Sequence, residues 1–304
     1  MSPSPDKYAV IGHPIAHSHS PWIHARFAEQ TGQNLVYEAI DSPPDGFAAS
    51  LKQLEKEGYA GANVTVPFKL EAFAAAGTHT PRAELAQAAN TLAWQAQAGG
   101  KGKKKTVTLH ADNTDGPGLI RDLVFTAGFT FAGENVLLLG AGGAGAGVLG
   151  SLIAVCPGSI TIANRTLQKS RELIARHQVW ANMHSVPMYA CTLDEALYDE
   201  APEDPEQPGK FALVVNATST SLQEQPLALP FKRINAMGMV MDLMYGPAAE
   251  AFLQPARQRG LNTRDGLGML VEQAALSFAL WREVRPKTAP VLAELRKRVD
   301  GGKA

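Results

Sequence analysis

The stretch VLLLGAGGAGAG, residues 136–147, joins a short apolar run to a glycine-rich loop. Gly140, Gly142 and Gly145 match the pattern G-x-G-x-x-G, and the residues that follow can form a helix. In this pattern the first glycine permits a tight turn, the second lets the backbone approach a pyrophosphate, and the third allows close packing of helix on strand. The N–H groups at the start of the helix then face the phosphates. The stretch therefore predicts a dinucleotide-binding loop.

The next predicted strand, SITIANRT (159–166), bears on which dinucleotide is bound. Loops that bind NAD usually have an acidic residue about 20 residues on, which holds the ribose 2′-hydroxyl. Here the strand ends in Asn164 and Arg165, with Lys169 one turn further and no carboxylate. A guanidinium suits a 2′-phosphate through paired charged hydrogen bonds. We therefore expect NADP(H) rather than NAD, although a surface arginine after a strand is the plainer alternative.

Apolar runs alternate with amphipathic ones along the whole chain, which predicts an α/β protein with mainly parallel sheets. The length of 304 residues favours two domains. The first is expected to be a substrate domain of residues 1–114 plus the returning C-terminal helices of 266–304. The second is expected to be a Rossmann-type NADP-binding domain of residues 115–265. A substrate would then lie in the cleft between them.

Particular segments give the expected elements. Strands are expected at 7–12, 35–40, 61–67, 134–140, 159–166, 211–219 and 238–245, with a hairpin around AGGKGKKK (98–105). Helices are expected at 20–32, with Ser20 as N-cap, and at 46–58, 68–77, 115–128, 143–156, 167–177, 268–284 and 289–299. The lysines of 99–105 are expected at a solvated hairpin tip, and the acidic, proline-rich residues 196–209 in an exposed loop.

Bulk composition excludes several classes of protein. The net charge of −1 leaves no overall footprint for nucleic acid. No apolar run reaches the roughly 18–20 residues that span a bilayer, and MSPSPDKYAV lacks the apolar centre of a signal peptide. The two cysteines match no zinc or redox spacing. We expect a cytoplasmic protein, monomer or homodimer, whose partner is a small-molecule substrate and not nucleic acid or membrane.

Lys69 and Asp115 are the candidate acid–base residues. Hydride transfer to a carbonyl also needs a proton donor. Lys69, in NVTVPFK, is expected in the first turn of a helix. A positive charge there is mildly unfavourable beside the helix dipole unless another group compensates it. Asp115, in DNTDG, stands at the junction of the two predicted halves. The plainer alternatives are a solvated lysine and an N-cap aspartate.

Two amides and a histidine-rich segment complete the candidates. Asn90 could end a helix, whereas Gln273 lies in the otherwise apolar VEQAAL and needs hydrogen-bond partners if buried. The segment AHSHSPWIH (16–24) raises the alternative of a metal site. No cysteine or carboxylate ligand set accompanies the histidines, so we expect no metal. Ser18 and Ser20, spaced i, i+2 before a helix, can instead form a neutral cradle for a carboxylate.

Taken together, these segments resemble the shikimate dehydrogenase family. The match runs in order through GHPIAHSHSPWIH, GANVTVPFK, AANTL, DNTDG, GAGGAG, NRT, VNATS, DLMY and DGLGMLVEQAA. The family reduces 3-dehydroshikimate to shikimate with NADPH, on the route to chorismate and the aromatic amino acids.

The resemblance implies a role for each matched residue. It implies that Ser18 and Ser20 bind the substrate carboxylate, that Lys69 is the acid–base residue and that Asp115 is its partner. The other substrate residues would be Thr65, Asn90 and Gln273. The cofactor contacts would be Gly140, Ala141, Gly142, Gly143, Ala144, Asn164, Arg165, Thr166, Lys169, Leu243, Tyr245 and Gly266.

Two departures from the family pattern concern the cofactor. Gly145 and Ala146 stand where the family often has Ser or Ala followed by Arg, and Lys169 stands where Arg is common. They leave open a broader quinate/shikimate dehydrogenase that uses NAD, although the missing acidic residue argues against it. A non-catalytic ligand sensor on the same fold is a further alternative. The presence of both Lys69 and Asp115 argues against that, because binding alone needs no proton relay.

Overall fold

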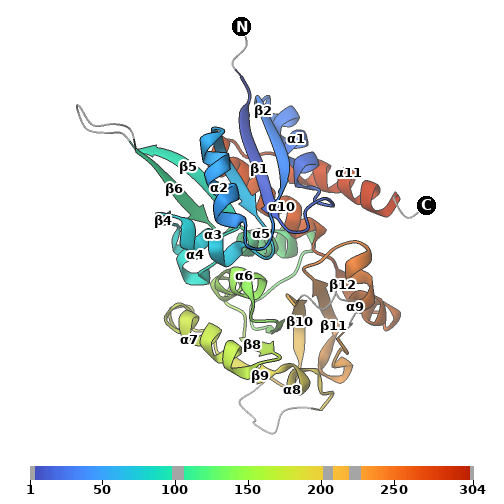
Figure 1. The fold of residues 1–304 in the computed structure, drawn as a ribbon. Helices are drawn as coiled ribbons and strands as arrows, with labels where there is room; N and C mark the ends of the chain where they lie inside the picture. The colour runs from blue at the N-terminus through green and yellow to red at the C-terminus, as the bar shows by residue number, and fades with distance from the viewer. Residues whose placement is uncertain (1–3, 98–105, 201–207, 219–226, 302–304) are drawn as a thin grey trace. The chain divides into compact units, whose positions relative to one another are not determined.

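The computed structural model describes residues 4–97, 106–200, 208–218 and 227–301 (Figure 1). The chain divides into two compact units. Unit 1 comprises Met1–Gly118 and Val271–Lys297, and unit 2 comprises Leu119–Leu270 and Arg298–Ala304. The lysine-rich residues 98–105 and residues 201–207, half of the acidic segment 196–209, lie outside the described ranges.

Unit 1 is built on a six-stranded sheet with the order β2-β1-β3-β5-β6-β4. The strands are β1 (Asp6–Gly12), β2 (Leu35–Asp41), β3 (Tyr59–Val64), β4 (Thr78–His79), β5 (Thr91–Gln97) and β6 (Thr106–Asp112). β1 pairs in parallel with β2 and β3, whereas β5 is antiparallel to β3 and β6. The predicted hairpin is confirmed as the β5–β6 pair.

Helices cover both faces of this sheet because its strands β1 and β3 have buried residues on both sides. The helices of unit 1 are α1 (Ser20–Thr31), α2 (Phe47–Lys56), α3 (Lys69–Ala75), α4 (Pro81–Ala86), the start of α5 (Asp115–Arg121), most of α10 (Leu267–Arg282) and most of α11 (Thr288–Gly301). Ala9 and Ile11 pack with α2 and α3 in one core cluster. On the alternate positions of β1, Tyr8 stacks on Trp281 of α10 with ring centroids 4.7 Å apart.

Unit 2 is a parallel sheet with the order β12-β11-β10-β7-β8-β9, the doubly wound arrangement of a Rossmann-type domain. Its strands are β7 (Asn135–Leu139), β8 (Ser159–Asn164), β9 (Met188–Thr192), β10 (Phe211–Asn216), β11 (Ile234–Asp242) and β12 (Asn262–Arg264). The helices α6 (Gly143–Ala154) and α7 (Leu167–Met183) pack in one core cluster, and α8 (Leu193–Leu197) and α9 (Pro247–Gln258) pack in the other. The α/β fold class is confirmed.

Several sequence predictions need correction. Ser20 is the first residue of α1 rather than its N-cap, which is His19. The strand predicted at 61–67 ends at Val64, because a turn closed by the Phe68 N–H and the Thr65 carbonyl follows it. The helix predicted at 115–128 changes at Asp122 into the π-helical turn Asp122–Thr126. Residues 196–197, expected in a loop, end helix α8.

In the ranges that the structure describes, no helix combines the length and apolar character needed to cross a membrane.

Candidate active site

Lys69 and Asp115 form a largely buried ion pair in unit 1. Lys69 is the first residue of α3 and Asp115 is the first residue of α5. The Lys69 Nζ lies 2.7 Å from the Asp115 Oδ2, and the two side chains are 15% and 7% exposed. The aspartate compensates the lysine that the sequence places at the start of a helix. An ammonium and a carboxylate at this distance can hold or move a proton on a bound hydroxyl.

Asn90 connects this pair to the other predicted amide. Its Nδ2 lies 2.8 Å from the Asp115 Oδ1 and 3.1 Å from the Gln273 Oε1. Its Oδ1 accepts a hydrogen bond of 2.8 Å from the Thr114 N–H. Asn90 and Gln273 are both buried, as expected for amides that are held by partners. Four of the predicted substrate residues therefore form one connected polar network.

Sequence reasoning missed the residue behind this network, Asn63 on β3. Its Nδ2 lies within 3.2 Å of the Asn90 carbonyl, the Thr91 hydroxyl and the Ser277 hydroxyl. Asn63 is 5% exposed and belongs to GANVTVPFK, the segment that also contains Lys69. A polar residue in an otherwise apolar strand was the available signal.

The two predicted carboxylate-binding serines are adjacent at the start of α1. The Ser20 N–H donates to the Ser18 Oγ over 3.3 Å, so the Ser18 hydroxyl satisfies one backbone N–H at the start of α1. Tyr37 is hydrogen-bonded to Ser20, and its hydroxyl donates to the Asn63 Oδ1 over 2.7 Å. The serines thus connect through Tyr37 and Asn63 to the Asn90 network.

Thr65 lies in the turn between β3 and α3, where its N–H donates to the Ile11 carbonyl over 2.9 Å. Gly12 of β1 packs against it so closely that an added Cβ would come within 2.4 Å of the Thr65 Cγ2. A glycine at position 12 is therefore required for the observed place of Thr65.

The histidines near the N-terminus have separate environments. His13 Nδ1 lies 2.9 Å from the Asp41 Oδ1, whereas His24 is fully buried and stacks on Tyr37 with centroids 4.1 Å apart. Across the described ranges, no group of three or more His, Cys, Asp or Glu side chains could hold a metal ion.

The glycine-rich loop in unit 2 has the geometry of a phosphate cradle. Gly140 adopts φ +106°, which side chains disfavour. A Cβ on Gly145 would lie 2.1 Å from the Gly140 carbonyl oxygen, so only glycine allows this approach of helix α6 to the loop. In contrast, a Cβ on Gly142 would meet no atom of the described residues within 4 Å. Among the residues that the structure describes, no side chain caps α6, which leaves the first N–H groups of the helix available to phosphate oxygens.

The residues predicted for the 2′-phosphate follow β8. The Asn164 Oδ1 accepts from the Ala141 N–H over 3.2 Å and its Nδ2 donates to the Thr166 carbonyl over 3.1 Å, which joins the glycine-rich loop to the start of α7. Arg165 and Lys169 are exposed. Within the described residues, neither of these two side chains has a hydrogen bond or an ion pair. Both cations are therefore available to an anionic ligand.

The remaining predicted cofactor residues lie in two loops that pack together. The Gly266 N–H donates to the Met244 carbonyl over 2.8 Å, and a Cβ on Gly266 would lie 2.0 Å from the Leu243 carbonyl oxygen. Burial and the nearby Asp265 carboxylate raise the pKa of Tyr245. Sequence reasoning missed Asp242, which is buried and accepts from the Met244 N–H over 2.8 Å.

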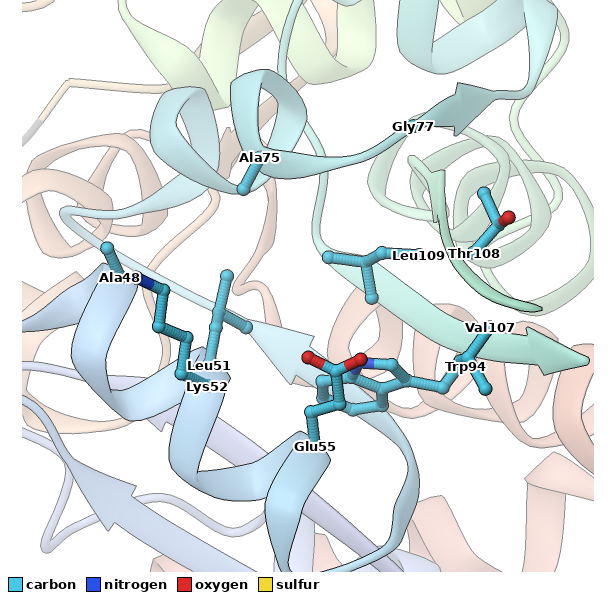
Figure 2. A pocket seen from close by; sticks show the side chains of 10 residues that line it. All are labelled: Ala48, Leu51, Lys52, Glu55, Ala75, Gly77, Trp94, Val107, Thr108 and Leu109. Atoms are coloured by element: carbon cyan, nitrogen blue, oxygen red, sulfur yellow. The ribbon is translucent and has the colours of Figure 1, made fainter. Parts of the chain in front are cut away.

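A separate groove lies on unit 1. Figure 2 shows the side chains that line it, including Leu51, Trp94 and Leu109, and its volume is about 390 Å³. Its two charged side chains, Lys52 and Glu55, are exposed. None of the predicted site residues lines this groove.

Comparison with known families decides the affiliation of the chain. Residues 10–92 match the model of the shikimate dehydrogenase substrate binding domain, 124–196 that of shikimate / quinate 5-dehydrogenase, and 266–296 that of the shikimate 5′-dehydrogenase C-terminal domain. Shikimate dehydrogenase (NADP(+)) of Acidovorax sp. strain JS42 is 46% identical over 303 residues, which is 99% of this chain and 100% of the relative. The chain belongs to the shikimate dehydrogenase family.

Other members of the shikimate dehydrogenase family are similar over their full length. The enzyme named shikimate dehydrogenase (NADP(+)) of Methylobacillus flagellatus is 47% identical, with 96% of this chain and 99% of the relative covered. The crystal structure of shikimate 5-dehydrogenase from Thermus thermophilus in complex with NADP(H) and shikimate matches with a TM-score of 0.76 and 32% identity, over 96% of this chain and 99% of the other.

Proposed function

We propose that the protein catalyses the reversible, NADPH-dependent reduction of 3-dehydroshikimate to shikimate, a step toward chorismate and the aromatic amino acids. The observation that carries the proposal is the buried Lys69–Asp115 pair, held by Asn90. The relatives named above support the substrate, and the shikimate and NADP(H) complex of the Thermus thermophilus enzyme supports the cofactor. Unit 1 would then be the substrate domain and unit 2 the NADP-binding domain.

Lys69 is the proton donor in the reduction direction. When a hydride reaches the carbonyl carbon of 3-dehydroshikimate, the oxygen gains negative charge and takes a proton from the Lys69 ammonium. In the oxidation direction the neutral amine takes the proton of the shikimate 3-hydroxyl. Asp115 holds the ammonium through the 2.7 Å contact and accepts from the substrate hydroxyl.

The other polar residues bind and orient the substrate. Ser18 and Ser20 receive its carboxylate through their hydroxyl groups, which fit an anion without adding charge. Asn90, Gln273 and Thr65 bind its hydroxyls. Since Asn90 contacts both Asp115 and Gln273, one bound hydroxyl can be fixed relative to the acid–base pair.

NADPH, when bound, supplies the hydride. The open space at Gly142 and the uncapped start of α6 fit a pyrophosphate. Arg165 and Lys169 would hold the 2′-phosphate, beside Asn164 and Thr166. Further along the chain, NADPH would contact Leu243, Tyr245 and Gly266.

Replacement of Lys69 tests the proposal. A positioned acid–base group contributes about 10²–10⁴-fold, so Lys69→Ala should lower kcat for shikimate oxidation by about that range and change KM much less. Lys69→Arg should not restore activity, because a guanidinium stays protonated. The measurement is absorbance at the reduced nicotinamide band with shikimate or quinate, each with NADP⁺ or NAD⁺.

Lys52→Ala removes an exposed lysine of unit 1 and should leave kcat unchanged. Retention of kcat within a few-fold in Lys69→Ala would mean that Lys69 only binds substrate. Oxidation of quinate with NAD⁺ at a higher kcat/KM than shikimate with NADP⁺ would overturn the proposed substrate and cofactor.

A further inference from the structure

Asp112, the first aspartate of DNTDG, is a buried carboxylate held by a single arginine. It ends β6 and is 1% exposed. The Arg82 Nε donates to the Asp112 Oδ1 over 2.6 Å and the Arg82 Nη2 donates to the Oδ2 over 2.5 Å. The Thr80 hydroxyl adds a third hydrogen bond to the Oδ1, over 2.6 Å. This is the paired geometry in which a guanidinium binds a carboxylate most specifically.

Asp112 is hydrogen-bonded toward both Asp115 and Asn90. Its Oδ1 accepts from the Asn113 N–H over 2.7 Å, and the Asn113 Oδ1 accepts from the Asp115 N–H over 3.1 Å. Its backbone carbonyl accepts from the Asn90 N–H over 3.1 Å. The backbone positions of Asp115 and Asn90, the two partners of the proposed chemistry, therefore both depend on Asp112.

The charge of Asp112 depends on Arg82. Burial alone would raise the pKa of Asp112, but the hydrogen bonds and charge of Arg82, with smaller contributions from Thr80 and the Asn113 N–H, hold that pKa below its usual value. The nearby histidines have other partners: His79 contacts the Phe73 carbonyl at 2.9 Å and His110 contacts the Thr78 hydroxyl at 3.0 Å. In the described chain, Arg82 is the cation that pairs with Asp112.

We infer that Arg82 and Asp112 are positioning residues of the reaction: their ion pair fixes the 112–115 segment so that Asp115 contacts Lys69 and Asn90 contacts Asp115. The inference rests on the proposed roles of Lys69 and Asp115. Neither Arg82 nor Asp112 touches the substrate in this assignment, and both act through the segment that they hold.

The test is the pH dependence of kcat for shikimate oxidation in Arg82→Gln. Misplacement of reacting groups by about 1 Å can cost about a hundredfold, so we expect kcat to fall roughly ten- to a hundredfold at neutral pH. The loss should deepen as the pH is lowered, because Asp112 without its arginine takes up a proton and releases the Asn113 N–H. The KM for NADP⁺ should stay at the wild-type value. Arg82→Lys keeps the charge and should restore the wild-type pH profile with part of kcat.

Arg257→Gln is the matched control, since it removes an arginine from an exposed ion pair with Glu250 and should change neither kcat nor its pH profile. Circular dichroism establishes whether each variant is folded. If Arg82→Gln is not folded, the kcat of Arg82→Lys decides: a value below that of the wild type supports the inference, and a wild-type value overturns it. Wild-type kcat in the folded variant, or a loss that is the same at every pH, would overturn the inference. Should Lys69→Ala keep its activity, the proposed chemistry fails first, whatever Arg82 does.

Discussion

At the scale of single residues, Asn90 shows why the proposed site needs an amide and not another polar group. Its Nδ2 donates toward Asp115 and Gln273 while its Oδ1 accepts from the Thr114 N–H. A carboxylate could not donate, and an alcohol could not make all of these contacts from one position. Because the residue is buried, each lost contact would leave an unsatisfied polar group.

Arg165 sets the proposed preference for NADP⁺. It is exposed and directly follows the Asn164 that joins the glycine-rich loop to α7. Loss of a hydrogen bond to a charged group costs roughly 1.5–3 kcal/mol. Arg165→Ala should therefore raise the KM for NADP⁺ about ten- to a hundredfold and leave the KM for NAD⁺ nearly unchanged, as measured by initial rates with each cofactor.

Arg257→Ala removes an exposed arginine elsewhere in unit 2 and should change neither KM. Equal increases for NADP⁺ and NAD⁺ in Arg165→Ala would contradict a contact with the 2′-phosphate.

At the scale of elements, helices α5 and α10 approach closely at Gly118. A Cβ at position 118 would lie 2.7 Å from the Gln273 Cβ and 2.8 Å from the Gln273 backbone nitrogen. Asp115 and Gln273 thus contact the same network because the absence of a side chain at Gly118 lets the two helices approach. Gly118→Ala would force them apart.

Gly118→Ala should raise the KM for shikimate and lower the free energy of unfolding by about 1–3 kcal/mol, the usual cost of an added methyl group in a packed region. Initial rates and urea unfolding measure the two effects. Gly209→Ala is the control, because a Cβ there would meet no atom of the described chain within 4 Å. An unchanged KM for shikimate would show that the separation of α5 and α10 does not fix Gln273.

Long periodic segments of the chain were predictable, and short ones were not. The strands β1, β7 and β10 and the helices α1, α6 and α10 follow from apolar periodicity and from the glycine-rich loop. The strands β4 and β12 have two and three residues, too few to show a period. Helix α9, which was not predicted, contains Pro255, a residue that disfavours a helix interior.

Some residues of the candidate site could be predicted from the sequence and others could not. Lys69, Asp115, Asn90 and Gln273 could be named from the sequence, and the structure brings them together. Asp112 could not, because its importance depends on Arg82 of α4, which is 30 residues away along the chain. Contacts that tertiary packing creates leave no local pattern in the sequence.

At the scale of the whole molecule, each unit contains one fully buried histidine. Burial lowers the pKa of His24 in unit 1 from 6.5 to about 3 and that of His177 in unit 2 from 6.5 to about 4. Below about pH 6.5 the unfolded chain takes up a proton at each residue while the folded chain does not. The stability that each buried, neutral histidine contributes is therefore fully present above pH 6.5 and is lost as the pH falls toward 3 or 4.

Acidification to pH 5 should lower the free energy of unfolding by about 2 kcal/mol for each of these histidines, from the 1.36 kcal/mol that corresponds to one pH unit. His24→Phe keeps an aromatic ring beside Tyr37 and cannot bind a proton, so unit 1 of this variant should lose about 2 kcal/mol less than the wild type between pH 7 and pH 5. Urea unfolding at the two pH values measures the difference. His17→Gln removes an exposed histidine of the same segment and should keep the wild-type dependence. If His24→Phe loses as much stability as the wild type on acidification, the sensitivity of unit 1 to acid arises from its carboxylates, of which the buried Asp112 beside Arg82 is the first to examine.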